Sequence, residues 1–285
     1  MSDGRHLVQL LAPGSGLHRK FWAGSIAGYA RHLIVAVETR HPAVDPLLEA
    51  TANMPGLKMY DEMSKLQALL MSEDEMVSFG RYMSPSALAF WLTEQVDLGA
   101  SVGDTAAGIG ILLAAVRASA PGVRVFGVEM SEDLMGVGRL AQLLSTSSSD
   151  YSWCRKADLL TLRDNLAVDS LVMSPPWVLR DNLRKCVLQW LAADSVYSSY
   201  TNLALFDICV PYVVESVART LRVGGAFVAT LPLRVSTAPE WTGFRSGGLF
   251  RARGVDVEMH FQSAPQEFQG AYPTQFVVAV GRRLA

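Results

Sequence analysis

The sequence predicts an α/β fold in which strands and helices alternate around a mostly parallel sheet. Residues 100–103 form a short strand-like run, residues 104–110 read DTAAGIG, and residues 111–116 are helix formers with few polar side chains. Two further apolar runs, at residues 123–128 and 170–173, end at an acidic residue and at a proline-rich turn. Because strands that alternate with helices are typical of parallel sheets, we expect a doubly wound arrangement.

The loop over residues 104–110 is the first candidate binding site. Gly108 and Gly110 allow backbone conformations that are closed to other residues and let a ligand approach the main chain. The helix that follows begins with N–H groups that lack intrahelical partners and can face a ligand. Taken alone, such a loop is as often a packing device as a binding site.

Glu129, at the end of the strand over residues 123–128, is the second candidate. In a doubly wound fold, an acidic residue about 20 positions beyond the glycine loop accepts hydrogen bonds from a ribose. The spacing favours that role, and a solvent-exposed strand end is the alternative.

The segment Ser174-Pro175-Pro176-Trp177 is the third candidate, directly after the strand over residues 170–173. Prolines have no backbone N–H group, so two in succession form a stiff turn that donates no hydrogen bonds. Such a turn can hold its carbonyl groups and the preceding side chain toward a ligand.

Four motifs in order resemble those of S-adenosylmethionine-dependent amino-methyltransferases that act on DNA. They are GRYMSP at residues 80–85, DTAAGIG, the acidic strand end at Glu129 and SPPW at residues 174–177. The resemblance covers roughly residues 80–285 and is closest to adenine-N6 enzymes, including modification subunits of type I restriction-modification systems. It implies the Rossmann-like class I methyltransferase fold, with a seven-stranded, mostly parallel sheet and a closing antiparallel hairpin strand. It also implies S-adenosyl-L-methionine as the cofactor.

The same resemblance implies which residues contact the cofactor. They come from the segment before the glycine loop, from the loop itself and from two acidic strand ends: Tyr82, Ser84, Asp104, Ala106, Gly108, Gly110, Glu129 and Asp158. Asp158 would accept a hydrogen bond from the amine of the cofactor's adenine, with a helix cap as the alternative role. For Tyr82 a place in the core, and for Ser84 a helix cap, are the alternatives.

Methylation of an exocyclic amine needs hydrogen-bond acceptors, because the lone pair of that amine is delocalised into the ring. In the family pattern, the Ser174 hydroxyl and the Pro175 carbonyl accept the amine hydrogens, Pro176 completes the turn and Trp177 stacks on the extruded base. These four residues are the predicted catalytic set. Most adenine enzymes with this motif order carry Asn or Asp in place of Ser174, so a cytosine-N4 target stays open.

Further elements follow the same patterns. Helices are expected over residues 130–144, 178–199 and 203–221, the last closed by Gly224-Gly225, and strands over residues 151–156, 226–231, 255–262 and 274–280.

Residues 1–79 are predicted to be a partly helical extension of unclear role, ahead of a methyltransferase domain at residues 80–285. Residues 32–37 read as a strand or a buried helix turn, whereas apolar residues over 57–70 recur at helical spacing. This extension is a candidate cover for the catalytic face, an oligomer contact or a part of substrate recognition.

Composition sets further limits. The 285 residues are 50% hydrophobic and 18% charged, which is enough for a large folded core. No apolar run reaches the roughly 18 residues of a membrane span and the N-terminus lacks a secretion signal, so we expect an intracellular, cytoplasmic protein. Three scattered cysteines and five scattered histidines indicate neither a disulfide framework nor a metal site.

The sequence favours a nucleic-acid base as the substrate, and adenine-N6 in DNA in particular. An RNA base, a protein glutamine and a non-catalytic methyltransferase-like subunit are the alternatives. A net charge of −2 is low for a protein that binds nucleic acid alone. Only residues 281–285 follow the last predicted strand, which is too few for a separate target-recognition domain. We therefore expect a partner subunit or a second copy to supply target recognition.

Overall fold

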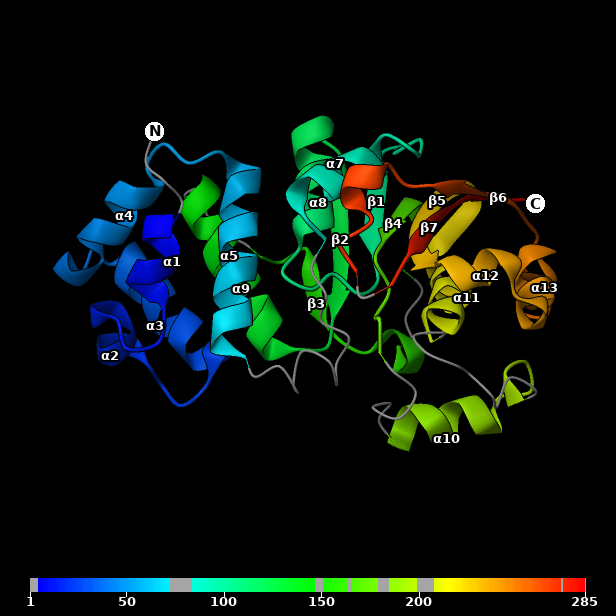
Figure 1. Cartoon of the computed structure of the whole chain (residues 1–285), viewed down its shortest axis with the longest axis horizontal. Helices are drawn as coiled ribbons and strands as arrows, with labels where there is room; N and C mark the ends of the chain where they lie inside the picture. The colour runs from blue at the N-terminus through cyan, green and yellow to red at the C-terminus, as the bar shows by residue number, and fades with distance from the viewer. Residues whose placement is uncertain are drawn as a thin grey trace.

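A seven-stranded sheet forms the centre of the molecule (Figure 1). The computed structural model describes residues 5–71, 84–146, 151–162, 166–178, 185–198, 208–272 and 274–284. The strand order is β3-β2-β1-β4-β5-β7-β6, and β1 to β5 are parallel while β7 runs antiparallel to β5 and to β6. The strands are β1 (Ser101–Asp104), β2 (Arg124–Glu129), β3 (Cys154–Lys156), β4 (Val168–Met173), β5 (Leu221–Pro232), β6 (Val257–Ser263) and β7 (Phe276–Arg283). The predicted sheet is therefore confirmed, including its antiparallel end.

The central parallel strands are buried because helices cover them on both faces. Every residue of β1 is buried, and so are five of the six residues of β4. The strand order reverses between these two strands, so the crossovers through α8 (Ile111–Ser119) and α11 (Cys209–Thr220) run in opposite directions. Right-handed crossovers then place the two helices on opposite faces, with α8 against β1 and β2 and α11 against β4 and β5.

Further helices surround this framework. They are α7 (Ser86–Thr93), α9 (Glu132–Thr146), α10 (Lys185–Ala193), α12 (Leu233–Thr237), α13 (Thr242–Arg245) and α14 (Gly248–Arg251), with 3-10 turns η2 (Leu159–Thr161), η5 (Pro239–Trp241) and η6 (Gln266–Phe268). Within the described ranges, no helix combines the length and the apolar character that a membrane crossing needs.

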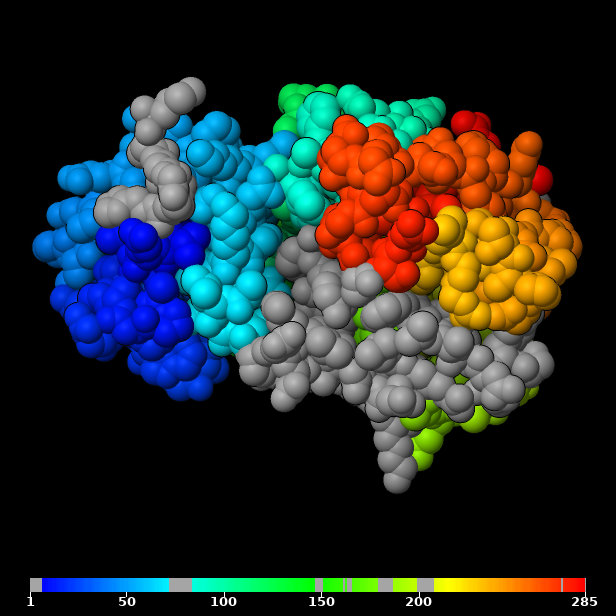
Figure 2. Space-filling model, in the orientation of Figure 1, coloured from blue at the N-terminus to red at the C-terminus, as the bar shows by residue number. Residues whose placement is uncertain are grey.

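The N-terminal residues form a helical layer at one end of the molecule, blue to cyan in Figures 1 and 2. It contains α1 (Arg5–Leu11), α2 (Gly16–Phe21), α3 (Ile26–Glu38), η1 (Pro42–Val44), α4 (Asp45–Thr51) and α5 (Gly56–Leu70). The layer is attached through α3 and α5, which both pack on α9. The Ala27 amide donates to Asp133 Oδ1 at 2.7 Å, which fixes the start of α3 against the start of α9.

Two predictions in this layer can be compared with the structure. The helix expected over residues 57–70 is confirmed as α5. Residues 32–37 belong to α3, which favours the helical alternative over the strand. The Ser25 hydroxyl accepts from the Gly28 amide at the start of this helix, and buried residues recur every three to four positions along it.

The predicted role of Gly224-Gly225 is wrong. Helix α11 already ends at Thr220, and β5 begins at the next residue, so the glycine pair lies inside a strand. Gly224 has a φ of +77°, and the register between β4 and β5 shifts beside it. A Cβ atom on Gly225 would lie 2.6 Å from the carbonyl oxygen of Asp169. The two glycines therefore serve a bulge and a close strand approach instead of a helix end.

The other predicted elements are present with shorter or shifted bounds. The third strand spans only residues 154–156 of the expected 151–156, and β5 contains the expected 226–231. The two C-terminal strands appear as β6 and β7, and the helix over 130–144 as α9. Within the helix expected over 178–199, α10 spans Lys185–Ala193, and residues 179–184 lie outside the described part.

Candidate active site

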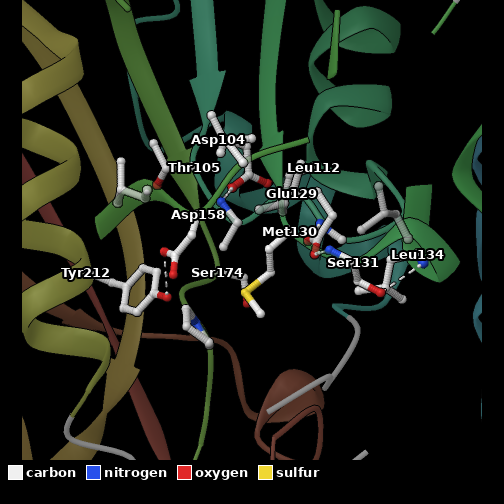
Figure 3. A pocket seen from close by; sticks show the side chains of 18 of the residues that line it. Asp104, Thr105, Leu112, Glu129, Met130, Ser131, Leu134, Asp158, Ser174 and Tyr212 are labelled. Atoms are coloured by element: carbon white, nitrogen blue, oxygen red, sulfur yellow. Dashed lines mark hydrogen bonds between the residues drawn. The ribbon is translucent and has the colours of Figure 1, made fainter. Parts of the chain in front are cut away.

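A cavity opens at the carboxyl ends of β1, β2 and β4 (Figure 3). Its volume is about 110 Å³, and it opens to solvent. The cavity lies where the strand order reverses, which is the usual ligand position in open α/β sheets. Its lining contains Ser84, Asp104, Thr105, Ala106, Ala107, Gly108, Ile111, Leu112, Val128, Glu129, Met130, Ser131, Leu134, Ala157, Asp158, Leu159, Ser174, Pro176 and Tyr212.

Asp104 ends β1 and is only 2% exposed. Its Oδ1 accepts from the Ala106 amide at 3.1 Å, which holds the first turn of the loop. The next residue, Thr105, lies with its hydroxyl 2.6 Å from that of Ser216 on α11. Burial, with a smaller contribution from the negative charge of Glu129, raises the pKa of Asp104 to about 7 although the Ala106 amide opposes this.

The two loop glycines face different surroundings. Gly108 lines the cavity with a φ of +57°. Gly110 is not among the lining residues: a Cβ atom there would lie 2.5 Å from the Trp153 ring and 3.1 Å from the Tyr151 hydroxyl. With its φ of +87°, Gly110 precedes the first residue of α8 and lets these two aromatic rings pack against the loop. Its role in this structure is therefore packing and chain reversal.

Glu129 uses both carboxylate oxygens to hold backbone segments around the cavity. Oε2 accepts from the Gly108 amide at 2.8 Å, and Oε1 accepts from the Ser131 amide at 2.7 Å. The side chain is 7% exposed and lies on the cavity wall (Figure 3). Carboxylate oxygens are hydrogen-bond acceptors, which is the property that binding a ligand hydroxyl needs. The predicted ribose acceptor is thus also the link between the glycine loop and the start of α9.

Asp158 caps a turn and also lines the cavity. Its Oδ1 accepts from the Leu160 amide at 3.0 Å, which caps the turn η2. The same oxygen lies 3.5 Å from the hydroxyl of Tyr212 on α11, and both side chains line the cavity (Figure 3). A cap therefore fixes the carboxylate in place without removing it from the cavity.

The four residues of the proline turn separate into two pairs. Ser174 and Pro176 line the cavity, whereas Pro175 and Trp177 are buried behind it. The buried Cys209 thiol lies 3.1 Å from the Pro176 carbonyl oxygen and 4.0 Å from the Pro175 carbonyl oxygen. The predicted acceptor carbonyl of Pro175 therefore lies next to a thiol of the core.

Trp177 is fully buried, and its ring is stacked on that of Tyr272, with centroids 4.5 Å apart and planes 9° apart. The stacking face predicted for an extruded base is therefore covered by another ring. The Tyr272 hydroxyl lies 2.7 Å from Ser84 Oγ and 2.9 Å from Ser174 Oγ. Burial raises the pKa of Tyr272 despite the hydrogen bonds with both serines, so the hydroxyl keeps its hydrogen at neutral pH.

Several functional candidates were missed by the sequence. Thr105, Met130, Ser131 and Tyr212 line the cavity, and Tyr272 touches two of its residues. Met130 and Ser131 follow Glu129 directly, so a search around the acidic strand end would have found them. Tyr212 and Tyr272 come from a helix and a connection that show no motif. Tyr82, a predicted cofactor residue, lies outside the described residues.

Of the predicted site, the structure brings Ser84, Asp104, Ala106, Gly108, Glu129, Asp158, Ser174 and Pro176 to one cavity. In the described part of the chain, no three histidine, cysteine or carboxylate side chains lie close enough together to hold a metal ion.

Comparisons with known proteins place the fold. No family model matches the sequence, and no curated protein is significantly similar to it. Among solved structures, a protein from Listeria monocytogenes assigned to the class I S-adenosylmethionine-dependent methyltransferases has a TM-score of 0.62 at 12% identity, over 99% of this chain and 88% of that one.

Two subunits of DNA-modification systems are also similar. The type I restriction-modification methyltransferase subunit from Streptococcus thermophilus has a TM-score of 0.51 at 16% identity, over 86% of this chain and 54% of that one. A protein from Vibrio vulnificus assigned as a type I modification subunit has a TM-score of 0.52 at 15% identity, over 81% of this chain and 50% of that one. The aligned part is thus about half the length of each subunit. The chain has the fold of the class I S-adenosylmethionine-dependent methyltransferases, which these type I modification subunits share.

Proposed function

We propose that the cavity binds S-adenosylmethionine. The Glu129 carboxylate, held on the cavity wall by the Gly108 and Ser131 amides, would accept the ribose hydroxyls, and Asp158 would accept from the adenine amine. Asp104, close to the glycine loop, would attract the positively charged methionine end when it is ionised. The chemistry of these donors and acceptors fits the cofactor, which supplies a methyl group activated by a sulfonium.

Calorimetric titration of S-adenosylmethionine tests this proposal. Glu129→Ala should weaken binding by about 1–3 kcal/mol, since a charged acceptor is lost, which is roughly 5- to 150-fold in Kd. Glu132→Ala is the matched control: Glu132 lies three residues further on, is exposed and pairs with Lys156 outside the cavity lining. Equal affinities for the two variants, or no binding by the unmodified chain, would refute the assignment.

We further propose that the transferred methyl group goes to the exocyclic amine of a nucleic-acid base, with adenine-N6 in DNA as the first candidate. The observation that supports this is that Ser174 and Pro176 line the same cavity as Asp104 and Glu129. An amine held by the Ser174 hydroxyl would form its bond to the methyl carbon while the carbon–sulfur bond breaks. The electron pair of that bond stays on sulfur, and the amine hydrogen leaves to water.

Single-turnover transfer of labelled methyl tests the substrate class. The unmodified chain is offered single-stranded DNA, duplex DNA, RNA and unfolded protein, and label in DNA is the expected result. Ser174→Ala should lower the transfer rate while cofactor affinity stays within about twofold, because the hydroxyl is assigned to the amine and not to the cofactor. Label in RNA or in protein alone would contradict the DNA target and leave the cofactor proposal intact.

One observation favours a second candidate, a methyltransferase-like subunit that binds cofactor without transferring its methyl group. The Trp177 ring is buried under Tyr272, so the platform for a base is closed in this structure. Cofactor binding without label in any acceptor, with or without a partner subunit, would support this candidate.

A further inference from the structure

The Tyr272 side chain occupies a position with two properties of a base site. Its ring lies parallel to Trp177 at a centroid distance of 4.5 Å, which is how an aromatic platform holds a base. Its hydroxyl lies between Ser84 and Ser174, at 2.7 and 2.9 Å. Both serines line the cavity, so the hydroxyl marks the point where a polar group of a stacked ring would meet the cavity wall.

The two serines can hold an amine as well as they hold a phenol. A protonated tyrosine hydroxyl has one hydrogen, so it can donate to only one of the two serines and must accept from the other. An exocyclic amine has two hydrogens and can donate to both hydroxyl oxygens at once. The pair of acceptors thus matches the group that amine methylation must orient.

The prolines give a second reason to assign the acceptor role to Ser84. The Pro175 and Pro176 carbonyl oxygens lie 4.0 and 3.1 Å from the buried Cys209 thiol. Ser84, which is 3% exposed, instead lines the cavity beside Ser174. A serine from the segment before α7 can therefore provide the acceptor that a backbone carbonyl does not provide here.

We infer that Tyr272 occupies the amine subsite of the resting chain, and that the substrate must displace it to stack on Trp177 and donate to Ser84 and Ser174. This inference rests on the proposed function and specifies how its site selects a substrate. The accepted ligand is a planar ring with an amino group at its edge. Tyr272 belongs to the connection between β6 and β7, which lies on the face shown in Figure 2 (orange-red), and its ring also packs edge-on against Phe276 at the start of β7.

Tyr272→Phe is the direct test, because it keeps the ring and removes the hydroxyl that occupies both serines. Fluorescence anisotropy measures the affinity of a labelled, mixed-sequence single-stranded oligodeoxynucleotide, and calorimetry measures S-adenosylmethionine affinity. The variant should bind the oligonucleotide about 2- to 13-fold more tightly, the equivalent of one net hydrogen bond of the competing side chain. Cofactor affinity should stay within about twofold. Tyr29→Phe is the control, since it removes another buried hydroxyl, one that donates to the Leu11 carbonyl in the N-terminal layer.

Ser84→Ala in the Tyr272→Phe background isolates the acceptor role. If Ser84 binds the amine, adding Ser84→Ala to Tyr272→Phe should weaken oligonucleotide binding by a similar factor. Loss of a contact with the Tyr272 hydroxyl could not explain this effect, because that hydroxyl is already absent. If Ser84 serves only Tyr272, the second substitution should have no effect, and the assignment of Ser84 fails.

The outcomes separate this inference from the proposed function. Unchanged or weaker oligonucleotide binding by Tyr272→Phe would show that the tyrosine is a fixed wall and would overturn the inference, even if methyl transfer to DNA is observed. Tighter binding by Tyr272→Phe without methyl transfer would support the inference and count against the catalytic proposal.

Discussion

Asp104→Asn should make the protein more stable at alkaline pH and less able to bind a cationic ligand. The carboxyl is 2% exposed, and burial beside Glu129 raises its pKa from 3.8 to about 7. Asparagine keeps the oxygen that accepts from the Ala106 amide and removes the charge. The substitution therefore changes the electrostatics of the cavity while keeping the loop's hydrogen bond.

The sign follows from proton binding. The folded state holds the Asp104 proton up to about pH 7, whereas the unfolded chain releases it near 3.8. The folded state thus binds more protons in between, and the free energy of unfolding falls as pH rises from about 4 to about 7. Over this interval of roughly three pH units, the free energy of unfolding falls by at most about 4 kcal/mol, at about 1.36 kcal/mol per unit. Asp104→Asn should match the unmodified protein at pH 4 and exceed its stability by up to that amount at pH 8.

Urea unfolding at pH 4, 6 and 8 measures this difference, and the subtraction between the two proteins cancels the titrating groups that do not interact with Asp104. Calorimetric titration at the same pH values measures the second effect. Affinity of the unmodified chain for S-adenosylmethionine should rise through about pH 7 as Asp104 ionises, while that of Asp104→Asn should be flat over this step. A stability difference that does not change between pH 4 and pH 8 would refute the buried-carboxylate reasoning.

Three further predictions concern packing and target binding. Gly110→Ala should lower the free energy of unfolding by about 1–3 kcal/mol, because an alanine there has a strained φ and meets the Trp153 ring; unchanged urea midpoints would contradict this. Trp177→Ala should cost about 3–5 kcal/mol of stability, as for other large buried rings, and thermal unfolding measures it against Trp22→Ala, a partly exposed ring. The chain alone should bind duplex DNA with a Kd of about 10⁻⁴–10⁻⁶ M at physiological salt, since its net charge is −2; nanomolar, sequence-selective gel shifts by a monomer would contradict it.

The parts of the site that the sequence predicted share one property: they are local. Asp104, Gly108 and Glu129 belong to a strand, a turn and the next strand end, so spacing along the chain fixes their positions once the sheet is parallel. The hydrogen bond from the Gly108 amide to Glu129 joins residues only 21 positions apart. Sequence spacing is sufficient at that range because β1 and β2 are neighbouring strands.

The surroundings of Gly110 could not be predicted from the neighbouring sequence alone. A glycine in a loop is compatible with a ligand above it or with a side chain above it, and the sequence does not distinguish them. The structure places Tyr151 and Trp153 there, from the segment that leads into β3. Gly224-Gly225 was misread for a similar reason: a helix end and a strand bulge both require a positive φ, and only the pairing with β4 decides.

The hydroxyls of Ser84, Ser174 and Tyr272 form a cluster that could not be predicted from the sequence, because it joins three segments that lie far apart along the chain. Ser84 and Tyr272 are 188 positions apart, and Ser174 and Tyr272 are 98 apart. Each serine was identified within its own motif, yet neither motif indicates that the two share a partner. Because Tyr272 contacts both serines and also covers Trp177, its displacement would expose two serine hydroxyls and one stacking face in a single step. Selection of a planar amine would then depend on one side chain outside every recognised motif.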